Sequence, residues 1–429
     1  MSRELKDTCI DWIGKIPKEW QVMKIKHILK ERNEKNTTLQ SKEILSLTAN
    51  QGVIPYSQKE CGGNKPKDDI TEYKLAYPND IVMNSMNVLS GAVGLSKYFG
   101  CVSPVYYMLF SRNEKSFNIK FVNYIFQTKL FQKSLLGLGN GIMMKESANG
   151  NLNTIRMRIP MEKINNLFLA IPSKDEQDKI VKFLDKKVME FDNVINKASQ
   201  SIEEYKKYKE TLIIEKVTYG LNLNVEFRPS QMEWIDEIPK HWDETLSRHV
   251  LKKLTREFEE DAEMLVCSNS GKVIKKSESK TGLVTEDEKK LQGVKVGDLL
   301  IHGMDTWHGA IAISELDGKC TPVVHVCDTK EDKKFIMYYL QSLAFRNVYK
   351  KITNGVRENT SDFRSWEKAG TIPLLIPPID EQKEISAYLD KKMKEIDDII
   401  MEKEKIIVNM EMYKKTYIYE YVTGKKEVI

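Results

Sequence analysis

The sequence predicts an α+β protein in which two mixed α/β domains are separated by two long α-helices that pair as an antiparallel coiled coil. Residues 173–219 and 379–423 contain no Pro or Gly, which favours uninterrupted helix in both stretches. Each stretch follows a longer segment with strand-like runs, and both halves carry the same motifs in the same order. A chain of 429 residues also exceeds what one hydrophobic core usually serves. We therefore predict an internal pseudo-twofold repeat.

The repeat sets the predicted domain boundaries. They are 1–172 for the first domain, 173–219 for the central helix, 220–378 for the second domain and 379–429 for the C-terminal helix.

Both helices begin with the same motif, Asp175-Glu176-Gln177 in the first and Asp380-Glu381-Gln382 in the second. Ser173 and Glu176 have the spacing of a capping box, which satisfies free N–H groups in the first turn. Apolar residues then recur in steps of four and three, the 3.5-residue period of a coiled coil. At about 1.5 Å per residue each helix would be roughly 65 Å long. One apolar stripe of that length needs a second helix to cover it, and the other copy is the nearest candidate.

The repeat also extends into the domains. Residues 11–20 return as 233–242, and each copy places two Trp around an Ile-Pro pair, which suits an apolar anchor at the start of a domain. Short apolar runs at 80–84 and 298–302 are bounded by Asp, Gly and Pro and are typical of strands in an antiparallel meander. Helix-like stretches follow, one from Phe121 and one from Phe335.

Composition describes an ordinary soluble protein, and its Cys usage predicts a reduced, cytoplasmic one. No run approaches 18 apolar residues, the first ten residues lack the pattern of a signal peptide, and the six Cys form no C-x-x-C pair. Residues 1–172 hold 24 Lys/Arg and 15 Asp/Glu, a balance of +9, whereas residues 219–378 hold 23 and 25, a balance of −2. If both domains bind phosphate, the second must rely on local clusters such as Arg346 with Lys350 and Lys351, or Arg357 with Arg364 and Lys368.

The usual signatures of catalysis are missing from the sequence. There is no phosphate-binding G-x-x-x-x-G-K-[ST] loop, and Gly137 to Gly141 needs only loop flexibility to explain it. His302 and His308 have no Cys or carboxylate at ligand spacing. We therefore predict no catalytic residue and no metal ligand in this chain.

What remains is a set of polar, aromatic and basic residues on predicted loops at matched places in the two domains. Arg and Asn suit bidentate contacts with base edges, and Lys suits phosphate. The candidate DNA-binding residues are Asn84, Ser85, Asn87, Ser90, Lys145, Arg156 and Arg158 in the first domain, and His302, Thr306, Trp307, Asn354, Arg357, Asn359 and Arg364 in the second.

The two Asp-Glu-Gln helix starts, the Leu-Asp-Lys-Lys heptads at 184–187 and 389–392, and the paired Trp segments together resemble the specificity subunit of type I restriction–modification enzymes. The resemblance covers nearly the whole chain and implies a cytoplasmic protein of a bacterium or archaeon. It implies that each domain is a target recognition domain for one half of a bipartite DNA sequence, with the helices fixing the spacer between the halves.

The same resemblance implies that this chain is not itself an enzyme. It would dock two methylation subunits, and restriction subunits would join them to form a type I site-specific deoxyribonuclease and adenine-specific DNA methyltransferase. S-adenosylmethionine, ATP and Mg would bind to those partners and no cofactor to this chain.

Two other functions stay open from the sequence. The chain could be a self-contained DNA methyltransferase or nuclease with unrecognised motifs, in which case the chain alone would transfer a methyl group or cut DNA. It could also be a coiled-coil scaffold that binds no nucleic acid.

Overall fold

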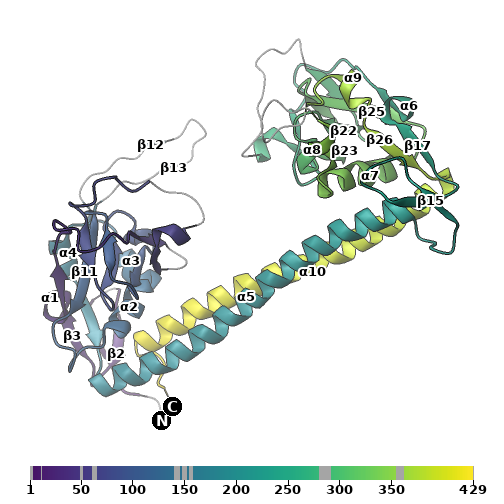
Figure 1. Ribbon diagram of the computed structural model, residues 1–429. Helices are drawn as coiled ribbons and strands as arrows, with labels where there is room; N and C mark the ends of the chain where they lie inside the picture. The colour runs from purple at the N-terminus through teal and green to yellow at the C-terminus, as the bar shows by residue number, and fades with distance from the viewer. Residues whose placement is uncertain are drawn as a thin grey trace. The chain divides into compact units, whose positions relative to one another are not determined.

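The computed structural model describes residues 3–10, 12–48, 52–59, 65–139, 145–146, 152–153, 158–279, 291–353 and 362–428. The chain divides into two compact units, one made of residues 1–197 and 406–429, the other of residues 198–405. Each unit contains a globular part and a segment of both long helices (Figure 1).

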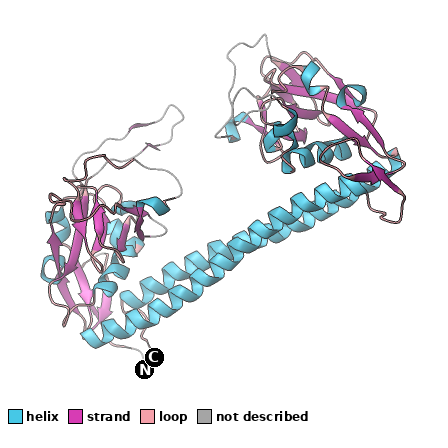
Figure 2. Ribbon diagram, in the orientation of Figure 1, coloured by secondary structure: helices cyan, strands magenta, loops and turns pink. Residues whose placement is uncertain are grey.

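The globular part of the first unit contains both strands and helices (Figure 2). It is built on a four-stranded antiparallel sheet with the strand order β4-β11-β8-β9. These strands are β4 (Leu29–Arg32), β8 (Ile81–Asn84), β9 (Val93–Leu95) and β11 (Tyr106–Ser111). Two-stranded ladders surround it: β1 (Leu5–Asp7) with β2 (Lys15–Pro17), β3 (Gln21–Lys24) with β14 (Phe168–Ile171), β5 (Leu45–Thr48) with β6 (Gly52–Pro55), β7 (Lys74–Ala76) with β10 (Gly100–Val102), and β12 (Lys145–Glu146) with β13 (Leu152–Asn153). The helical elements are α1 (Ile25–Ile28), η1 (Tyr56–Gln58), η2 (Val88–Ser90), α2 (Ile119–Gln127), α3 (Lys129–Ser134) and α4 (Met161–Asn165).

The second unit repeats this plan, with a sheet of order β18-β25-β22-β23. Its strands are β18 (Leu251–Lys253), β22 (Leu299–His302), β23 (Ile311–Ile313) and β25 (Val324–Thr329). The ladders are β15 (Phe227–Pro229) with β16 (Glu237–Pro239), β17 (Asp243–Leu246) with β26 (Pro373–Ile376), β19 (Leu265–Cys267) with β20 (Val273–Lys275), and β21 (Gln292–Val294) with β24 (Gly318–Cys320). The helical elements are α6 (Ser247–Val250), η3 (Lys276–Glu278), η5 (Thr306–His308), α7 (Lys333–Phe345), α8 (Val348–Ile352) and α9 (Trp366–Ala369).

Each unit therefore contains its predicted strand run and its predicted domain helix. The predicted apolar anchors are also present, because Trp20 and Trp242 are among the most completely buried side chains of the cores on either side. Each Trp packs edge-on against a Phe in the first turn of the domain helix, Trp20 on Phe121 and Trp242 on Phe335, with ring centroids 6.1 Å and 6.3 Å apart. Such edge-to-face pairs add about 0.5–1.5 kcal/mol beyond the area they bury.

The long helices are α5 (Lys174–Tyr219) and α10 (Ile379–Val422), and they pack together in antiparallel fashion, as predicted. Within the first unit, the ring centroids of Phe183 and Tyr421 lie 4.5 Å apart, and those of Phe191 and Tyr417 lie 5.4 Å apart. Residue numbers therefore increase along α5 as they decrease along α10, which makes the helices antiparallel. Lys403 interrupts the apolar stripe of α10 at the position where α5 has Ala198. Its Nζ lies 5.6 Å from the centre of the Tyr205 ring of α5, within the second unit.

Two salt bridges mark the pseudo-twofold relation between these helices. In the first unit Lys414 Nζ lies 2.6 Å from Asp192, and in the second unit Lys209 Nζ lies 2.5 Å from Asp397. Lys209 and Lys414, like Asp192 and Asp397, are the two copies of one position in the sequence repeat.

The end of α10 closes the core of the first unit. Ile418 and Val422 belong to the same buried cluster as Trp20. Gly424 follows with a φ of +70°, and a Cβ there would lie 2.5 Å from Pro17 Cδ, so only Gly fits. The last turn of the chain is therefore a structural part of the first unit.

Candidate nucleic-acid interface

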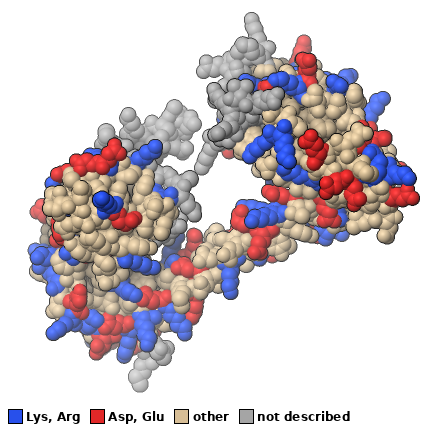
Figure 3. All heavy atoms as spheres, viewed as in Figure 1, with Lys and Arg blue, Asp and Glu red and all other residues tan. Residues whose placement is uncertain are grey.

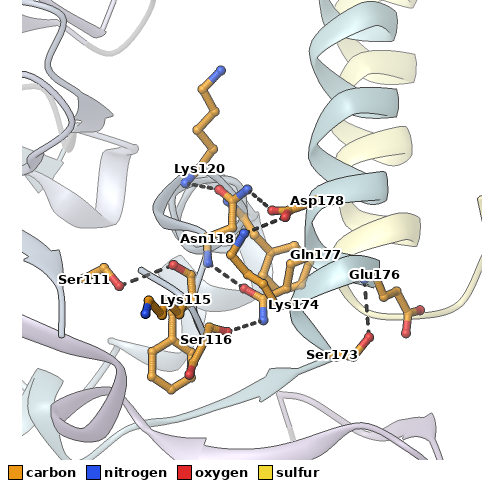
Figure 4. Close-up of polar contacts among 12 residues, drawn as sticks. Ser111, Lys115, Ser116, Asn118, Lys120, Ser173, Lys174, Glu176, Gln177 and Asp178 are labelled. Carbon is orange, nitrogen blue, oxygen red and sulfur yellow. Dashed lines mark hydrogen bonds and ion pairs between the residues drawn. The ribbon is translucent and has the colours of Figure 1, made fainter. Parts of the chain in front are cut away.

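The motif at the start of α5 fastens the first globular part to that helix (Figure 4). The side chain of Gln177 is fully buried, and its Oε1 accepts a hydrogen bond from the backbone N of Asn118 at 2.7 Å. Its Nε2 donates to the carbonyl oxygens of Ser116 and Pro172 at 3.1 Å and 3.0 Å. Asn118 caps α2 and also donates to Asp178 at 2.6 Å, so the start of the domain helix and the start of α5 are tied together.

The predicted capping box forms in a modified way. The backbone N of Glu176 donates to Ser173 Oγ at 3.3 Å, as expected. The Glu176 carboxylate accepts from Trp20 Nε1 at 3.2 Å and pairs with Arg3 at 2.7 Å. The same Glu thus joins the Trp anchor to the helix, because a buried indole N–H needs an acceptor.

The second unit repeats these contacts. Gln382 Oε1 accepts from the backbone N of Asp332 at 3.0 Å, and its Nε2 donates to the Pro377 carbonyl at 2.8 Å. Trp242 Nε1 donates to Glu381 at 3.1 Å. The repeated Asp-Glu-Gln motif is therefore accounted for as a joint between domain and helix.

The Leu-Asp-Lys-Lys heptads make a further joint. Tyr124 on α2 donates to Asp185 at 2.8 Å, and Tyr338 on α7 donates to Asp390 at 2.8 Å. Burial, followed by the bond to the carboxylate, raises the pKa of both phenols above their usual value, so both stay protonated donors.

The candidate site lies where β8 and β22 end, in the loops 84–91 and 302–309. In the first loop Asn84 Oδ1 accepts from the backbone N of Met86 at 2.9 Å, and in the second His302 Nδ1 accepts from the backbone N of Asp305 at 3.0 Å. Each loop then makes a short helix, η2 or η5, and ends on a Gly with positive φ, +89° at Gly91 and +82° at Gly309. The two loops are copies of one backbone scaffold.

A later segment of the chain is hydrogen-bonded to the backbone of each loop. Ile159 N donates to the Ser85 carbonyl and Phe363 N donates to the Gly303 carbonyl, both at 3.0 Å. The carbonyl of Ile159 accepts from Tyr107, and that of Phe363 is bonded to His325 at 2.6 Å.

The backbone approaches more closely in the second copy. A Cβ at Gly303 would lie 2.6 Å from the Phe363 carbonyl oxygen, which explains why Gly stands there in place of Ser85.

The scaffold is shared, but the side chains that it exposes differ. Asn87 and Ser90 are exposed in the first loop, and His308 is exposed at the position of Ser90 in the second. Trp307 is half-buried, its ring lies 3.6 Å from that of His308, and Lys350 Nζ lies 4.7 Å from its centre. The second loop thus presents an aromatic and cationic cluster where the first presents small polar groups. Equal frames with unequal side chains suit recognition of two different ligand sequences.

Two histidines beneath the second loop are held neutral. Burial lowers the pKa of His302 below its usual 6.5, and the nearby Asp305 carboxylate opposes this only in part. Burial also lowers the pKa of His325, and its hydrogen bond to Phe363 opposes this in part. Its Nδ1 has no hydrogen-bond partner among the described residues, which fits a neutral ring.

The remaining predicted site residues fall into four groups. Asn84, Ser85 and Thr306 are buried, and Ser85 Oγ donates to the Val105 carbonyl at 2.7 Å, so these residues build the loops from inside. Arg158 and Arg364 are exposed. The backbone of Lys145 lies in β12, next to Asn153. The predicted positions that lie outside the described residues are Arg156, Asn354, Arg357 and Asn359.

The prediction that Arg346 belongs to a phosphate-binding cluster is wrong. Arg346 is half-buried and donates to the Trp234 carbonyl at 3.1 Å, to Thr218 Oγ1 at 2.5 Å and to the Ile214 carbonyl at 3.4 Å. The guanidinium thus binds the Ile214 carbonyl and the Thr218 hydroxyl near the C-terminal end of α5, where a helix favours positive charge. The exposed cations of that cluster are Lys350 and Lys351.

Charge of both signs is spread over the visible faces. Figure 3 shows basic and acidic side chains interspersed on each unit. In the part of the chain that the structure describes, no three His, Cys, Asp or Glu side chains are grouped so as to hold a metal ion. None of the helices with described residues has the length and apolar character needed to cross a bilayer.

Proteins with a similar sequence or fold are known. No protein-family model matches the chain. Two relatives from Methanocaldococcus jannaschii align along nearly the full length of both proteins. The type I restriction enzyme MjaX specificity subunit is 23% identical over 97% of this chain and 96% of its own, and the MjaVIII specificity subunit is 24% identical over 96% and 94%.

A solved chain from a study of assembly and conformational transition in a type I R-M system has the same fold. It superimposes with a TM-score of 0.67 at 10% identity and covers 96% of this chain and 99% of its own.

Proposed function

Because this chain belongs to the family of type I restriction enzyme specificity subunits, we propose that it selects the DNA sequence on which such a complex acts. Each globular part would recognise one half of a bipartite target, and the chain would carry no catalytic site of its own. The relation spans the whole chain, so both copies of the repeat are included.

The observation that carries this proposal is the pair of matched loops, 84–91 and 302–309. Their hydrogen-bonded frames are alike, while their exposed side chains differ in size, charge and aromatic character. A dimeric reader with two equal sites would bind a symmetric target, since half-sites mirror the symmetry of the protein. One chain with two unequal sites fits an asymmetric target.

The long helices supply the second element of the proposal. Each runs without interruption through more than 40 residues, and each contributes to both units. Paired helices bend little, whereas a flexible linker would allow a range of spacings. We propose that α5 and α10 fix the number of base pairs between the half-sites.

The partners follow from the same assignment. We propose that two methylation subunits dock on this chain and that restriction subunits join through the complex. S-adenosylmethionine, ATP and Mg would be bound by those subunits, and the adenine to be methylated would be taken out of the base stack by the methylation subunit.

A domain exchange tests the proposal. Residues 243–370 are replaced by the matching segment of a relative, and the methylated sequence is determined in cells that contain the partner subunits. We expect one half-site to change, while the other half-site and the spacer remain. An unchanged target would contradict the assignment of the second unit as a recognition domain.

A second measurement separates this function from a self-contained enzyme. The purified chain is incubated alone with DNA, labelled S-adenosylmethionine and Mg. We expect neither label transfer nor cleavage, and either activity from the lone chain would overturn the proposal.

A further inference from the structure

An apolar groove lies within the first unit between the α2–α3 junction and the C-terminal part of α10. It has a volume of about 580 Å³ and is lined by residues 127–130 and by one side of α10 from Val408 to Tyr419. Val408 and Met412 are 65% and 54% exposed, so two large apolar side chains on adjacent turns of α10 face solvent. Exposed apolar side chains that cluster in this way mark interaction sites.

The groove, called the α10 groove below, is not repeated by the pseudo-twofold relation. The sequence repeat places Glu203 at the position of Val408 and Lys207 at the position of Met412. Both are exposed on α5 within the second unit, and Glu203 pairs with Lys206 at 2.8 Å. One copy of this helix face is therefore apolar and the other is charged.

The spacing of the apolar pair indicates what the α10 groove accepts. Val408 and Met412 are four residues apart and lie along the helix axis, so a partner helix with apolar residues at the same spacing can pack against both. Leu130 supplies an apolar wall on the opposite side.

The rim of the groove adds a charge preference. Lys129 and Lys415 line the groove, both are exposed, and no ion pair is found for either within the described residues. Glu411 is the one acidic residue among those that line it. An amphipathic helix with acidic residues beside its apolar stripe complements this surface.

We propose that the α10 groove binds such a helix from one methylation subunit. The charged counterpart on α5 does not bind the second methylation subunit in the same way. This inference rests on the proposed function. It adds that the two methylation subunits are held with unequal affinity, one by an apolar groove and one without it.

The test replaces the two apolar residues with those of the counterpart position, in the variant V408E/M412K. Both side chains are exposed and the new residues are compatible with helix, so the fold should be kept, which circular dichroism and thermal melting check. The matched control, E203Q/K207Q, changes the same number of residues at the counterpart position on α5.

Binding of the methylation subunit encoded with this chain is followed by native mass spectrometry and by titration. For the wild-type chain and the control we expect two binding steps that differ by about tenfold or more in Kd. In V408E/M412K we expect the tighter step to weaken by about tenfold or more, because two apolar side chains no longer lose water on binding. K129E/K415E should weaken the same step.

Four results would overturn the inference. Two binding steps of equal Kd in the wild-type chain would remove the asymmetry, and unchanged binding by V408E/M412K would remove the groove; both would leave the proposed function standing. Self-association of the wild-type chain that V408E/M412K abolishes would assign the groove to a second copy instead. No binding of the methylation subunit by the wild-type chain would contradict the proposed function as well.

Discussion

The buried Gln177 offers a sharp test of how the globular part is joined to α5. Met has nearly the same volume and shape as Gln, so the substitution Gln177→Met removes hydrogen bonds while leaving the packing close to native. It leaves the backbone N of Asn118 without its acceptor, and it leaves the carbonyls of Ser116 and Pro172 without this donor.

The expected cost follows from these three groups. A buried N–H left without an acceptor costs about 1–3 kcal/mol. The two carbonyls add less, because a carbonyl oxygen has two lone pairs and can accept a hydrogen bond from another donor. We therefore expect Gln177→Met to lower the free energy of unfolding by about 2–4 kcal/mol. Gln382→Met should cost a similar amount, because its carboxamide makes the matching contacts in the second unit.

Urea unfolding followed by Trp fluorescence measures this cost, because Trp20 lies in the core next to the joint. Glu204→Gln, on an exposed position of the same helix, is the control and should change the free energy by less than about 0.5 kcal/mol. A loss below about 0.5 kcal/mol for Gln177→Met would refute the view that this motif fastens domain to helix. In cells, the loosened joint should let the complex methylate targets with altered spacers while the half-sites stay the same.

Three further predictions concern the candidate interface. Trp307→Ala should weaken binding to the specific target by about 1–3 kcal/mol in fluorescence anisotropy, the usual size of one base contact, whereas Val296→Ala, at an exposed site outside the two loops, should not; equal affinities would place Trp307 outside the interface. Arg158→Gln should reduce the slope of log K against log salt concentration by about 1 if Arg158 contacts a phosphate, and an unchanged slope would exclude that contact. Since the folded pKa of His302 and of His325 is lowered, the unfolded chain binds more protons near pH 6, so stability should fall as the pH drops below the unfolded value of about 6.5. The variant H302N/H325Y, with the residues of the first unit, should flatten that urea-midpoint profile, and a profile as steep as wild type would assign the pH dependence to other groups.

The fold was largely predictable because its signals are periodic and repeated. Heptad spacing and the absence of Pro and Gly identified α5 and α10, and short apolar runs bounded by Gly and Asp identified β8 and β22. The pairing of the helices followed from the need to cover a long apolar stripe.

The candidate site was less predictable, since residue type does not reveal surroundings. Arg346 and Ser85 were expected to face DNA, and the structure uses both for internal hydrogen bonds. The role of Gln177 was missed, although exact repetition of its motif was a usable signal. The α10 groove could have been found by comparing copies, because Val408 and Glu203 occupy one position of the repeat.

The return of the chain to its starting unit has a consequence for biosynthesis. The second unit is a single continuous stretch, residues 198–405, whereas the first lacks Ile418 and Val422 until α10 has been translated. On the ribosome the nascent second unit can therefore complete its core while the earlier-made segment still exposes apolar surface around Trp20. The core of the first unit is therefore completed after that of the second, when the end of α10 packs beside Trp20 and Gly424 lies against Pro17.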